Sequence, residues 1–406
     1  CCTGSALTAS IDQAIADGVD VINYSIGSPS ASDVWNDFDT VGFLNAREAG
    51  IFVATSAGND GPGAATVGSP ADAPWLTSVG ASTHSRTWVN EVSFTGGDSA
   101  LATITGNAFT DGYGPATIVY AGDFGDALCL DPFAAGTWTS DEIVVCDRGQ
   151  IARTDKGENV AAGGAGGLIL ANDEGNAASI NADPHVIPAS HISFADGVAL
   201  KSWLASGAGH SATITAGVYT QDPARADIMA GFSSRGENRA IDIISPHVSA
   251  PGVDILAAYG IDDEIKWDMI SGTSMASPHV AGAGALLMQQ NPTWTPAEIQ
   301  SALMLTGNTT VLDNDATTPA TPFGMGRGVV VLGDANDASL VMDETYANYL
   351  AADPASSGDP KTLNLPNMAN SQCVLECSWE RTVTATSAGT WTVAATADTG
   401  VLLSVS

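Results

Sequence analysis

The stretch SGTSMASPHVAG, residues 271–282, decides how the rest of the chain is interpreted. It places Ser274 among small residues, just before a proline and a run rich in alanine and glycine. Because proline is tolerated only near the start of a helix, Pro278 predicts a helix that begins close to Ser274. Each glycine in the run costs up to about 1 kcal/mol relative to alanine, so packing must compensate and the helix is expected to be buried.

A serine at the start of a helix has two interpretations. It can be a cap that satisfies free backbone N–H groups. It can also be a nucleophile, because the helix N-terminus stabilises negative charge that develops during attack on a carbonyl. A serine nucleophile needs a neighbouring base to take its proton, so the second interpretation requires such a base.

A second candidate segment is VATSAGNDGPG, residues 53–63. An apolar strand ends there at Asn59, among glycines that let backbone and substrate approach closely. A side-chain amide is a good oxyanion donor. Asn59 is equally interpretable as a turn residue, since asparagine tolerates left-handed backbone conformations.

The order of elements around these segments predicts an α/β fold. Leu7, Ile11 and Ile15 recur every four residues before Gly18, which is typical of an amphipathic helix that ends at a glycine. Apolar strands are predicted at 19–27 and 51–55, with a helix at 36–49 between them. Alternation of helices with continuously apolar strands predicts a parallel sheet with helices on both faces.

The pattern of predicted secondary-structure elements changes twice along the chain. Residues 115–206 contain short strands split by Gly, Asn and Asp and one helix near 195–205, which predicts a small β-rich domain inserted into the α/β one. The α/β pattern is expected to resume with ATITAG, GFSSRG and DILAAYG. Thr295 to Glu298 reads as a capping box with proline at the first helical position. Residues 351–406 predict a linker followed by the start of a β-sandwich.

Composition limits the class of protein. The chain has 45 acidic and 13 basic side chains, a formal charge of −32, which disfavours nucleic acid and anionic membranes as partners. No apolar run is long enough to span a membrane. The six cysteines form three pairs, of which Cys129–Cys146 and Cys373–Cys377 suggest disulfides and therefore secretion, with buried free thiols as the alternative.

These segments together resemble the subtilisin-like proteases, or subtilases. GTSMASPHVAG is similar to the serine motif of that family, ATSAGNDG to its oxyanion segment and DGVDVINYSIG to its substrate-binding strand. APGVDILAAY and GFSSRG are also similar to family segments. EIVVCDRG, KGENVAAGGAGGLILAN and HVIPAS resemble a protease-associated domain, and the tail from NLPNMANSQC to RTVTATSAGTWTV resembles the start of a fibronectin type III-like domain.

The resemblance implies four segments and a set of site residues. The segments are a first part of the catalytic domain at 1–114, a protease-associated domain at 115–206, a second catalytic part at 207–350 and an incomplete fibronectin type III-like domain at 351–406. Ser274 would be the nucleophile and Asn59 the oxyanion donor. The implied substrate-binding residues are Ser25, Ile26 and Gly27, which would pair with the substrate backbone, and Ser56, Ala57 and Gly58, which would line the primary specificity pocket.

None of the six histidines is expected to be the base. His279 follows Ser274 on the same helix at a separation that points the two side chains apart. His84 reads as a surface turn and His247 as a structural residue, while His185, His191 and His210 fall in or beside the inserted region. The family carries its aspartate and histidine in segments upstream of what corresponds to Cys1, so we expect the base in a missing N-terminal portion of the same precursor and this fragment alone to be inactive.

The expected function is therefore a secreted, extracellular serine endopeptidase that acts on protein or peptide substrates. The alternative is a catalytically dead protease-like binding module. No cofactor is expected to be required, and a homo-oligomer is compatible with the family. The acidic runs Asp262-Asp263-Glu264 and Asp313-Asn314-Asp315 could hold structural calcium, or be solvated surface charge, since they lack the spacing of a calcium loop.

Overall fold

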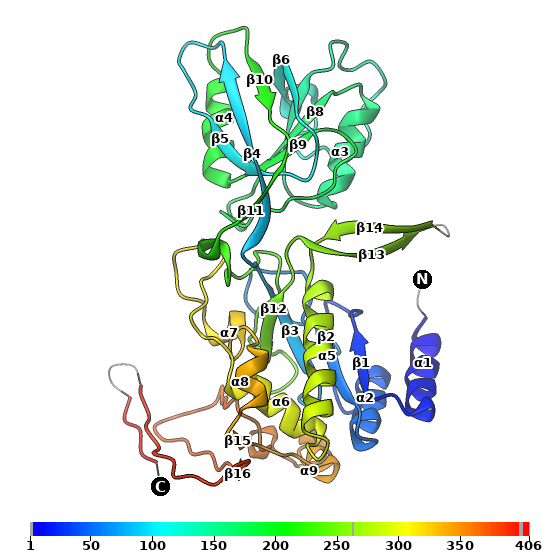
Figure 1. Cartoon of the computed structure of the whole chain (residues 1–406), viewed down its shortest axis with the longest axis vertical. Coiled ribbons are helices and arrows are strands. Elements are labelled where there is room, and N and C mark those ends of the chain that lie inside the picture. The colour runs from blue at the N-terminus through cyan, green and yellow to red at the C-terminus, as the bar shows by residue number, and fades with distance from the viewer. Residues whose placement is uncertain (1–2, 262–263, 398–400, 406) are drawn as a thin grey trace.

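The computed structural model describes residues 3–261, 264–397 and 401–405. Figure 1 shows two stacked units, a lower unit built on a four-stranded sheet and an upper unit built on an eight-stranded one. The strands of the upper unit all lie within residues 86–221. A hairpin projects sideways at the level where the units meet, formed by β13 (Ile255–Ile261) and β14 (Glu264–Ile270).

The lower sheet is entirely parallel and has the order β1-β2-β3-β12. Its strands are β1 (Val21–Tyr24), β2 (Phe52–Ser56), β3 (Thr77–Ser82) and β12 (Val248–Pro251). Their carboxyl ends meet at one edge, where sites gather in parallel sheets. The prediction of an α/β fold with a parallel sheet is confirmed.

The helices of the lower unit follow the sequence signals closely. α1 ends at Gly18, whose φ of 69° is left-handed, and the predicted capping box opens α6 at Thr295 with both of its hydrogen bonds present. The helices are α1 (Gly4–Asp17), α2 (Phe38–Glu48), α5 (Thr273–Gln290), α6 (Pro296–Leu305), α7 (Pro322–Met325), α8 (Leu332–Asn336) and α9 (Tyr346–Ala351). Short 3₁₀ helices lie at Ala121–Phe124, Pro223–Arg225, Pro354–Ser356 and Pro360–Thr362.

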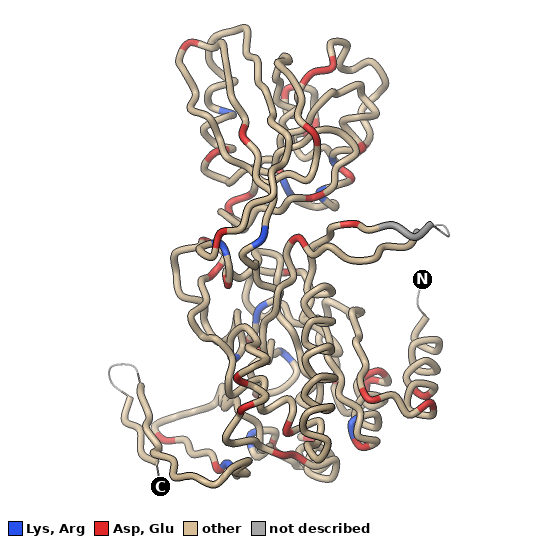
Figure 2. Tube along the Cα trace, viewed as in Figure 1, with Lys and Arg blue, Asp and Glu red and all other residues tan. Residues whose placement is uncertain are grey.

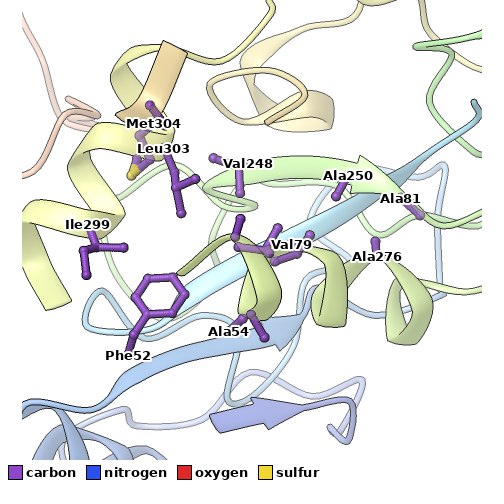
Figure 3. Packing of buried hydrophobic residues seen from close by; sticks show 14 of the residues in the cluster. Phe52, Ala54, Val79, Ala81, Val248, Ala250, Ala276, Ile299, Leu303 and Met304 are labelled. Carbon is purple, nitrogen blue, oxygen red and sulfur yellow. The ribbon is translucent and has the colours of Figure 1, made fainter. Parts of the chain in front are cut away.

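Alternate residues of a strand point to opposite faces of a sheet. In the lower sheet both faces are covered by apolar clusters. Phe52 and Ala54 of β2 belong to the apolar cluster formed with α5 and α6 (Figure 3). Val53, between them, belongs to the cluster on the other face, which contains Phe43 and Leu44 of α2. The sheet therefore lies between two helical layers.

Helix α5 packs through one face only. Its sheet side carries small buried residues such as Ala276 and Gly284. On the other side Leu286 is 51% exposed, and a Cβ placed on Gly282 would meet nothing within 4 Å. The prediction of a buried helix is right for the sheet side and wrong for this outer face.

The upper unit is a mixed sheet whose pairing closes on itself. Its order is β10-β6-β7-β8-β9-β5-β4-β11, and β10 also pairs with β4. The strands are β4 (Arg86–Thr95), β5 (Ile104–Asn107), β6 (Tyr113–Tyr120), β7 (Ile143–Asp147), β8 (Gly167–Ala171), β9 (Ala189–Ile192), β10 (Ser211–Ile214) and β11 (Val218–Gln221). Two helices cover it, α3 (Arg153–Ala162) and α4 (Phe194–Leu204).

Three predicted segments differ from the structure after residue 206. ATITAG supplies β10 of the upper sheet and does not continue the parallel sheet. DILAAYG forms β13 of the projecting hairpin, where its partner strand is antiparallel. GFSSRG is a loop, and the strand that extends the parallel sheet here is β12. Short apolar runs fit a parallel strand, a barrel strand and a hairpin equally well, and partners distant in sequence decide among them.

Two disulfides are present in the described chain, as predicted: Cys129–Cys146 in the upper unit and Cys373–Cys377 near the C-terminus. Cys1 and Cys2 lie outside the described residues, as do Asp262 and Asp263 of the first acidic run. Near the C-terminus, β16 (Thr384–Ala385) pairs with β15 (Leu340–Val341).

The distribution of charged residues over the structure agrees with the acidic composition of the sequence. Figure 2 shows acidic positions distributed along both units and far fewer basic ones. In the part of the chain that the structure describes, no helix combines the length and the hydropathy needed to cross a bilayer.

The contact between α5 and β2 gives a test of the packing. A Cβ on Gly284 would lie 2.4 Å from the ring of Phe52, a residue that is 1% exposed. We expect Gly284→Ala to lower the free energy of unfolding by about 1–2 kcal/mol, because overpacking outweighs the gain in helix propensity. Gly282→Ala, on the open face of the same helix, should raise it by about 0.5–1 kcal/mol. Urea denaturation measures both, and equal stability of the two variants would contradict this packing.

Candidate functional site

A cleft of about 400 Å³ lies at the carboxyl edge of the lower sheet. The turn after β1, the end of β2 and the start of α5 form its walls. All eight residues that the sequence singled out line it: Ser25, Ile26, Gly27, Ser56, Ala57, Gly58, Asn59 and Ser274. Segments separated by more than two hundred residues in sequence therefore converge on one hollow.

Asn59 is held in place by the residue that precedes Ser274. Its Oδ1 accepts hydrogen bonds from the backbone N–H and from the hydroxyl of Thr273, both at 2.9 Å. The Thr273 hydroxyl in turn accepts from the backbone N–H of Gly58 at 3.3 Å. These two bonds fix the orientation of the amide group, and Nδ2 of Asn59 donates to no group in the described part of the chain, so it is available as a donor.

Ser274 is hydrogen bonded to Ser25, in the wall of the cleft that follows β1. Its hydroxyl donates to the main-chain oxygen of Ser25 at 3.4 Å, and the hydroxyl of Ser25 donates to the main-chain oxygen of Ser274 at 2.8 Å. One turn further along α5, the Ser277 hydroxyl donates to Oδ1 of Asn23, whose Nδ2 donates to the Ser25 hydroxyl. This chain of bonds sets the position of the nucleophile candidate relative to β1.

The start of α5 offers a second candidate donor for an oxyanion, the backbone N–H of Ser274. The first backbone N–H groups of a helix have no intrahelical partner, so the N–H of Ser274 is available to a ligand. Ser274 lines the same cleft as Asn59. Two donors beside a hydroxyl are what stabilises the charge on a carbonyl oxygen during acyl transfer.

No histidine in the described chain hydrogen bonds to Ser274. His279 is exposed and its Nδ1 lies 2.8 Å from the main-chain oxygen of Met275, within its own helix. His247 is buried and accepts from the backbone N–H of Ser78, as expected of a structural residue, and burial lowers its pKa to about 4. His84 is half-buried beside the upper unit and not a simple surface turn, and burial lowers its pKa.

The remaining histidines lie in the upper unit. His191 is buried and His185 is half-buried, and desolvation lowers the pKa of both. His210 packs against Trp203, with its Nε2 2.7 Å from the main-chain oxygen of Ser206. All six histidines of the sequence lie in the part of the chain that the structure describes, and none of them has a hydrogen bond to Ser274.

A second cavity, of about 680 Å³, lies on the other side of Asn59. Asn59 and Asp60 line both hollows. Its remaining walls come from both units, with Phe232 and Ser271 below and the 148–154 segment above. The site thus adjoins the surface where the two units meet.

Sequence reasoning missed the residues that support this arrangement. Thr273 stands beside Ser274 in the quoted motif and its hydroxyl fixes Asn59, yet a threonine at a helix start reads as a cap. Asn23 lies in a strand that was assigned on hydropathy alone. The one available sign was that both are polar residues within two positions of a candidate site residue, Ser274 for Thr273 and Ser25 for Asn23.

Thr273 provides a test of the site that needs no assay of activity. Thr273→Val keeps the shape but removes the hydroxyl donor to Asn59 and leaves the partly buried N–H of Gly58 without an acceptor, so unfolding free energy should fall by about 1–3 kcal/mol and by more than in Thr273→Ser. Thr273→Ser retains the hydroxyl and should cost about 1 kcal/mol for the lost methyl group. Urea unfolding of both variants checks this, and a valine variant as stable as the serine one would mean that the hydroxyl holds nothing.

Comparison with known proteins gives a consistent answer. The sequence profile of the subtilase family matches residues 2–328. The chain is 35% identical over 455 aligned residues to subtilisin-like protease SBT1.7 of Arabidopsis thaliana, with all of this chain and 59% of the relative covered. Subtilisin-like proteases SBT1.6 and SBT5.4 of the same plant are 34% and 36% identical, covering 92% and 86% of this chain and 51% and 47% of the relatives.

The chain spans about half the length of the curated relatives it matches. The family match nevertheless covers most of the sequence, and it includes both strand ends and the helix that form the cleft. The chain belongs to the subtilase family of subtilisin-like serine proteases.

Proposed function

We propose that this chain carries the nucleophile and the oxyanion site of a secreted serine endopeptidase that acts on proteins or peptides. The observation that carries the proposal is that Ser274, at the start of a helix, and Asn59, whose Oδ1 is held by Thr273, line one cleft. The family membership supports the same reaction class. The two disulfides support an oxidising, extracellular location.

The proposed reaction is acyl transfer. A substrate segment pairs with Ser25, Ile26 and Gly27 as an added strand, and its carbonyl oxygen points at the two donors. The Ser274 hydroxyl attacks the carbonyl carbon while its proton passes to a base, and the base then protonates the departing amine. Water releases the acyl group from Ser274 by the same steps in reverse.

The base in this scheme comes from outside the 406 residues. Since none of the histidines contacts Ser274, we propose that the histidine and its aspartate belong to an N-terminal portion of the same precursor, in the order Asp, His, Ser known for subtilisin. The fragment alone is then inactive. In subtilisin, a member of the same family, removal of the catalytic histidine lowers turnover by about a millionfold.

The segments around the site have proposed identities as well. The upper unit corresponds to a protease-associated domain, and the region from about 351 onward to the start of a fibronectin type III-like domain. The closed mixed sheet with its two helices supports the first assignment. A catalytically dead binding module remains the second candidate, and it is disfavoured because such a module has no need of the hydrogen bonds that keep Asn59 and Ser274 in place.

Substitution of Ser274 tests the proposal directly. In the precursor extended at its N-terminus, Ser274→Ala should lower peptide hydrolysis by about a millionfold, the magnitude known for the serine of subtilisin, and abolish labelling by a fluorophosphonate. Asn59→Ala should lower kcat by about 100- to 1000-fold, again as for subtilisin, because one oxyanion donor is lost.

The matched control is Ser10→Ala. Ser10 is an exposed helical serine in α1 whose hydroxyl bonds only within its own helix. Its substitution should leave both hydrolysis and labelling unchanged. Activity that persists in Ser274→Ala would remove the proposed nucleophile.

Structural calcium is tested by chelation. The second acidic run already has protein partners, because Asp313 accepts from Arg235 at 2.9 Å and Asp315 accepts from the backbone and hydroxyl of Thr318. We therefore propose that this run binds no calcium and expect the same melting temperature with and without EDTA. A lower melting temperature in EDTA that calcium restores would overturn this.

A further inference from the structure

The upper unit touches the lower unit at the residues that lead into the nucleophile segment. The contact comes from the loop between β8 and β9, where Asn181 and Ala182 are 1% and 0% exposed. Nδ2 of Asn181 donates to the Ser271 hydroxyl at 3.0 Å. The backbone N–H of Ala182 donates to both carboxylate oxygens of Asp254, at 3.0 and 3.1 Å.

On the lower side, Ser271 and Asp254 are bound to each other. The Ser271 hydroxyl accepts from the backbone N–H of Asp254 at 2.8 Å and donates to Oδ1 of Asp254 at 3.2 Å. These two residues bracket the projecting hairpin, one just before β13 and the other just after β14. The four residues therefore form a joint between the units, which we call the 181–271 joint (Asn181, Ala182, Asp254 and Ser271).

The joint lies next to the catalytic candidate. Ser271 comes shortly before Ser274, with Gly272 and Thr273 between them. The N–H of Gly272 donates to the main-chain oxygen of Gly252 at 2.8 Å, and Thr273 binds Asn59. Every residue from 271 to 273 is thus fixed by a contact to a different segment, and the upper unit supplies the first of these contacts.

We propose that Asn181 of the upper unit is a positioning residue that, through Ser271 and Asp254, holds the start of α5 and hence Ser274 in place. The inference rests on the proposed function, because holding Ser274 matters to catalysis only if Ser274 is the nucleophile. The upper unit then affects the reaction without touching the substrate. Its loop is itself anchored, since the N–H of Asn181 donates to Nδ1 of the buried His191 at 2.9 Å.

Ionisation of Asp254 should affect the joint. Asp183 and Arg153 of the upper unit, which pair with each other at 2.5 Å, face this carboxyl, and the ring of His84 faces its main chain. Burial, followed by the charge of Asp183, raises the pKa of Asp254 to about 7 from its ordinary 3.8. The folded protein therefore holds this proton over a range in which the unfolded chain has lost it, and stability from this group decreases as pH rises from about 4 to 7.

The first measurement is hydrogen exchange of the backbone amides of residues 271–276 in the 406-residue chain. Asn181→Ala should speed exchange there by about 3- to 10-fold, the factor that corresponds to loss of one net hydrogen bond. The matched control is Asn159→Ala, because Asn159 is also a buried asparagine of the upper unit but its Nδ2 donates to Cys129 within that unit. The control should leave exchange at 271–276 unchanged.

A second pair of variants separates positioning from general loosening. Adding Asn181→Ala to Ser271→Ala should change exchange at 271–276 no further, because the bond is already broken. Unchanged exchange in Asn181→Ala, or equal acceleration in Asn159→Ala, would overturn the proposal. Hydrogen exchange does not depend on catalysis, so the two proposals can fail separately. Activity that survives Ser274→Ala would contradict the proposed function but not the role of Asn181. Unchanged exchange in Asn181→Ala would contradict the role of Asn181 but not the proposed function.

The pH arm uses Asp254→Asn, which keeps an acceptor for Ala182. Asp254 has a φ of 55°, a left-handed conformation that asparagine also tolerates. Between pH 5 and 8 the melting temperature of the wild type should fall relative to that of Asp254→Asn, since only the wild type ionises there. A constant difference across this range would show that Asp254 is not the buried, proton-linked acceptor of the joint.

Discussion

The bond between Asn59 and Thr273 is the constraint on which the site depends. A single amide oxygen takes two donors from Thr273, and this ties the end of β2 to the first turn of α5. The same bond fixes the orientation of the amide, so one interaction sets both the position and the polarity of the proposed oxyanion donor. The reciprocal pair of Ser25 and Ser274 holds the opposite wall. Since rotation of a polar side chain at a strand end is otherwise inexpensive, these partners are what make the arrangement rigid.

The packing beneath the site explains why α5 carries so many small residues. Ala54, Ala81, Ala250 and Ala276 lie together between sheet and helix (Figure 3). Small side chains on both surfaces let the helix approach the sheet closely, and at Gly284 the backbone itself meets the ring of Phe52. A helix that rests on its neighbours at such short range has few alternative positions, because any shift opens a void or creates a clash. This packing fixes the position of the first turn of α5 at the carboxyl edge of the sheet.

The sequence was sufficient for features that depend on neighbours along the chain. The glycine end of α1, the capping box of α6 and the strands β1 and β2 follow from short-range patterns, and all are present. The site residues could be named from motifs, but their supports could not. Whether ATITAG joins a parallel sheet or a closed mixed one is decided by β4 and β6, and the role of Thr273 by Asn59 in the turn after β2. The helix α3 was missed because its ten residues contain one large apolar side chain, Val160, and a glycine in the middle, Gly157.

Four of the 13 basic residues are buried inside the units: Arg47, Arg148, Lys156 and Arg235. Arg47 donates to Gln300 and to the main-chain oxygen of Trp75, and the buried Lys156 donates to the main-chain oxygen of Leu128. These cations link segments within a unit and do little to offset the acidic surface. The 181–271 joint, in contrast, contains amide and hydroxyl donors and one buried carboxylate. Added salt should therefore weaken repulsion across the exposed surface while leaving this joint intact, because buried hydrogen bonds are screened far less than exposed charges. The proposed joint should therefore hold the start of α5 in place over a wide range of ionic strength.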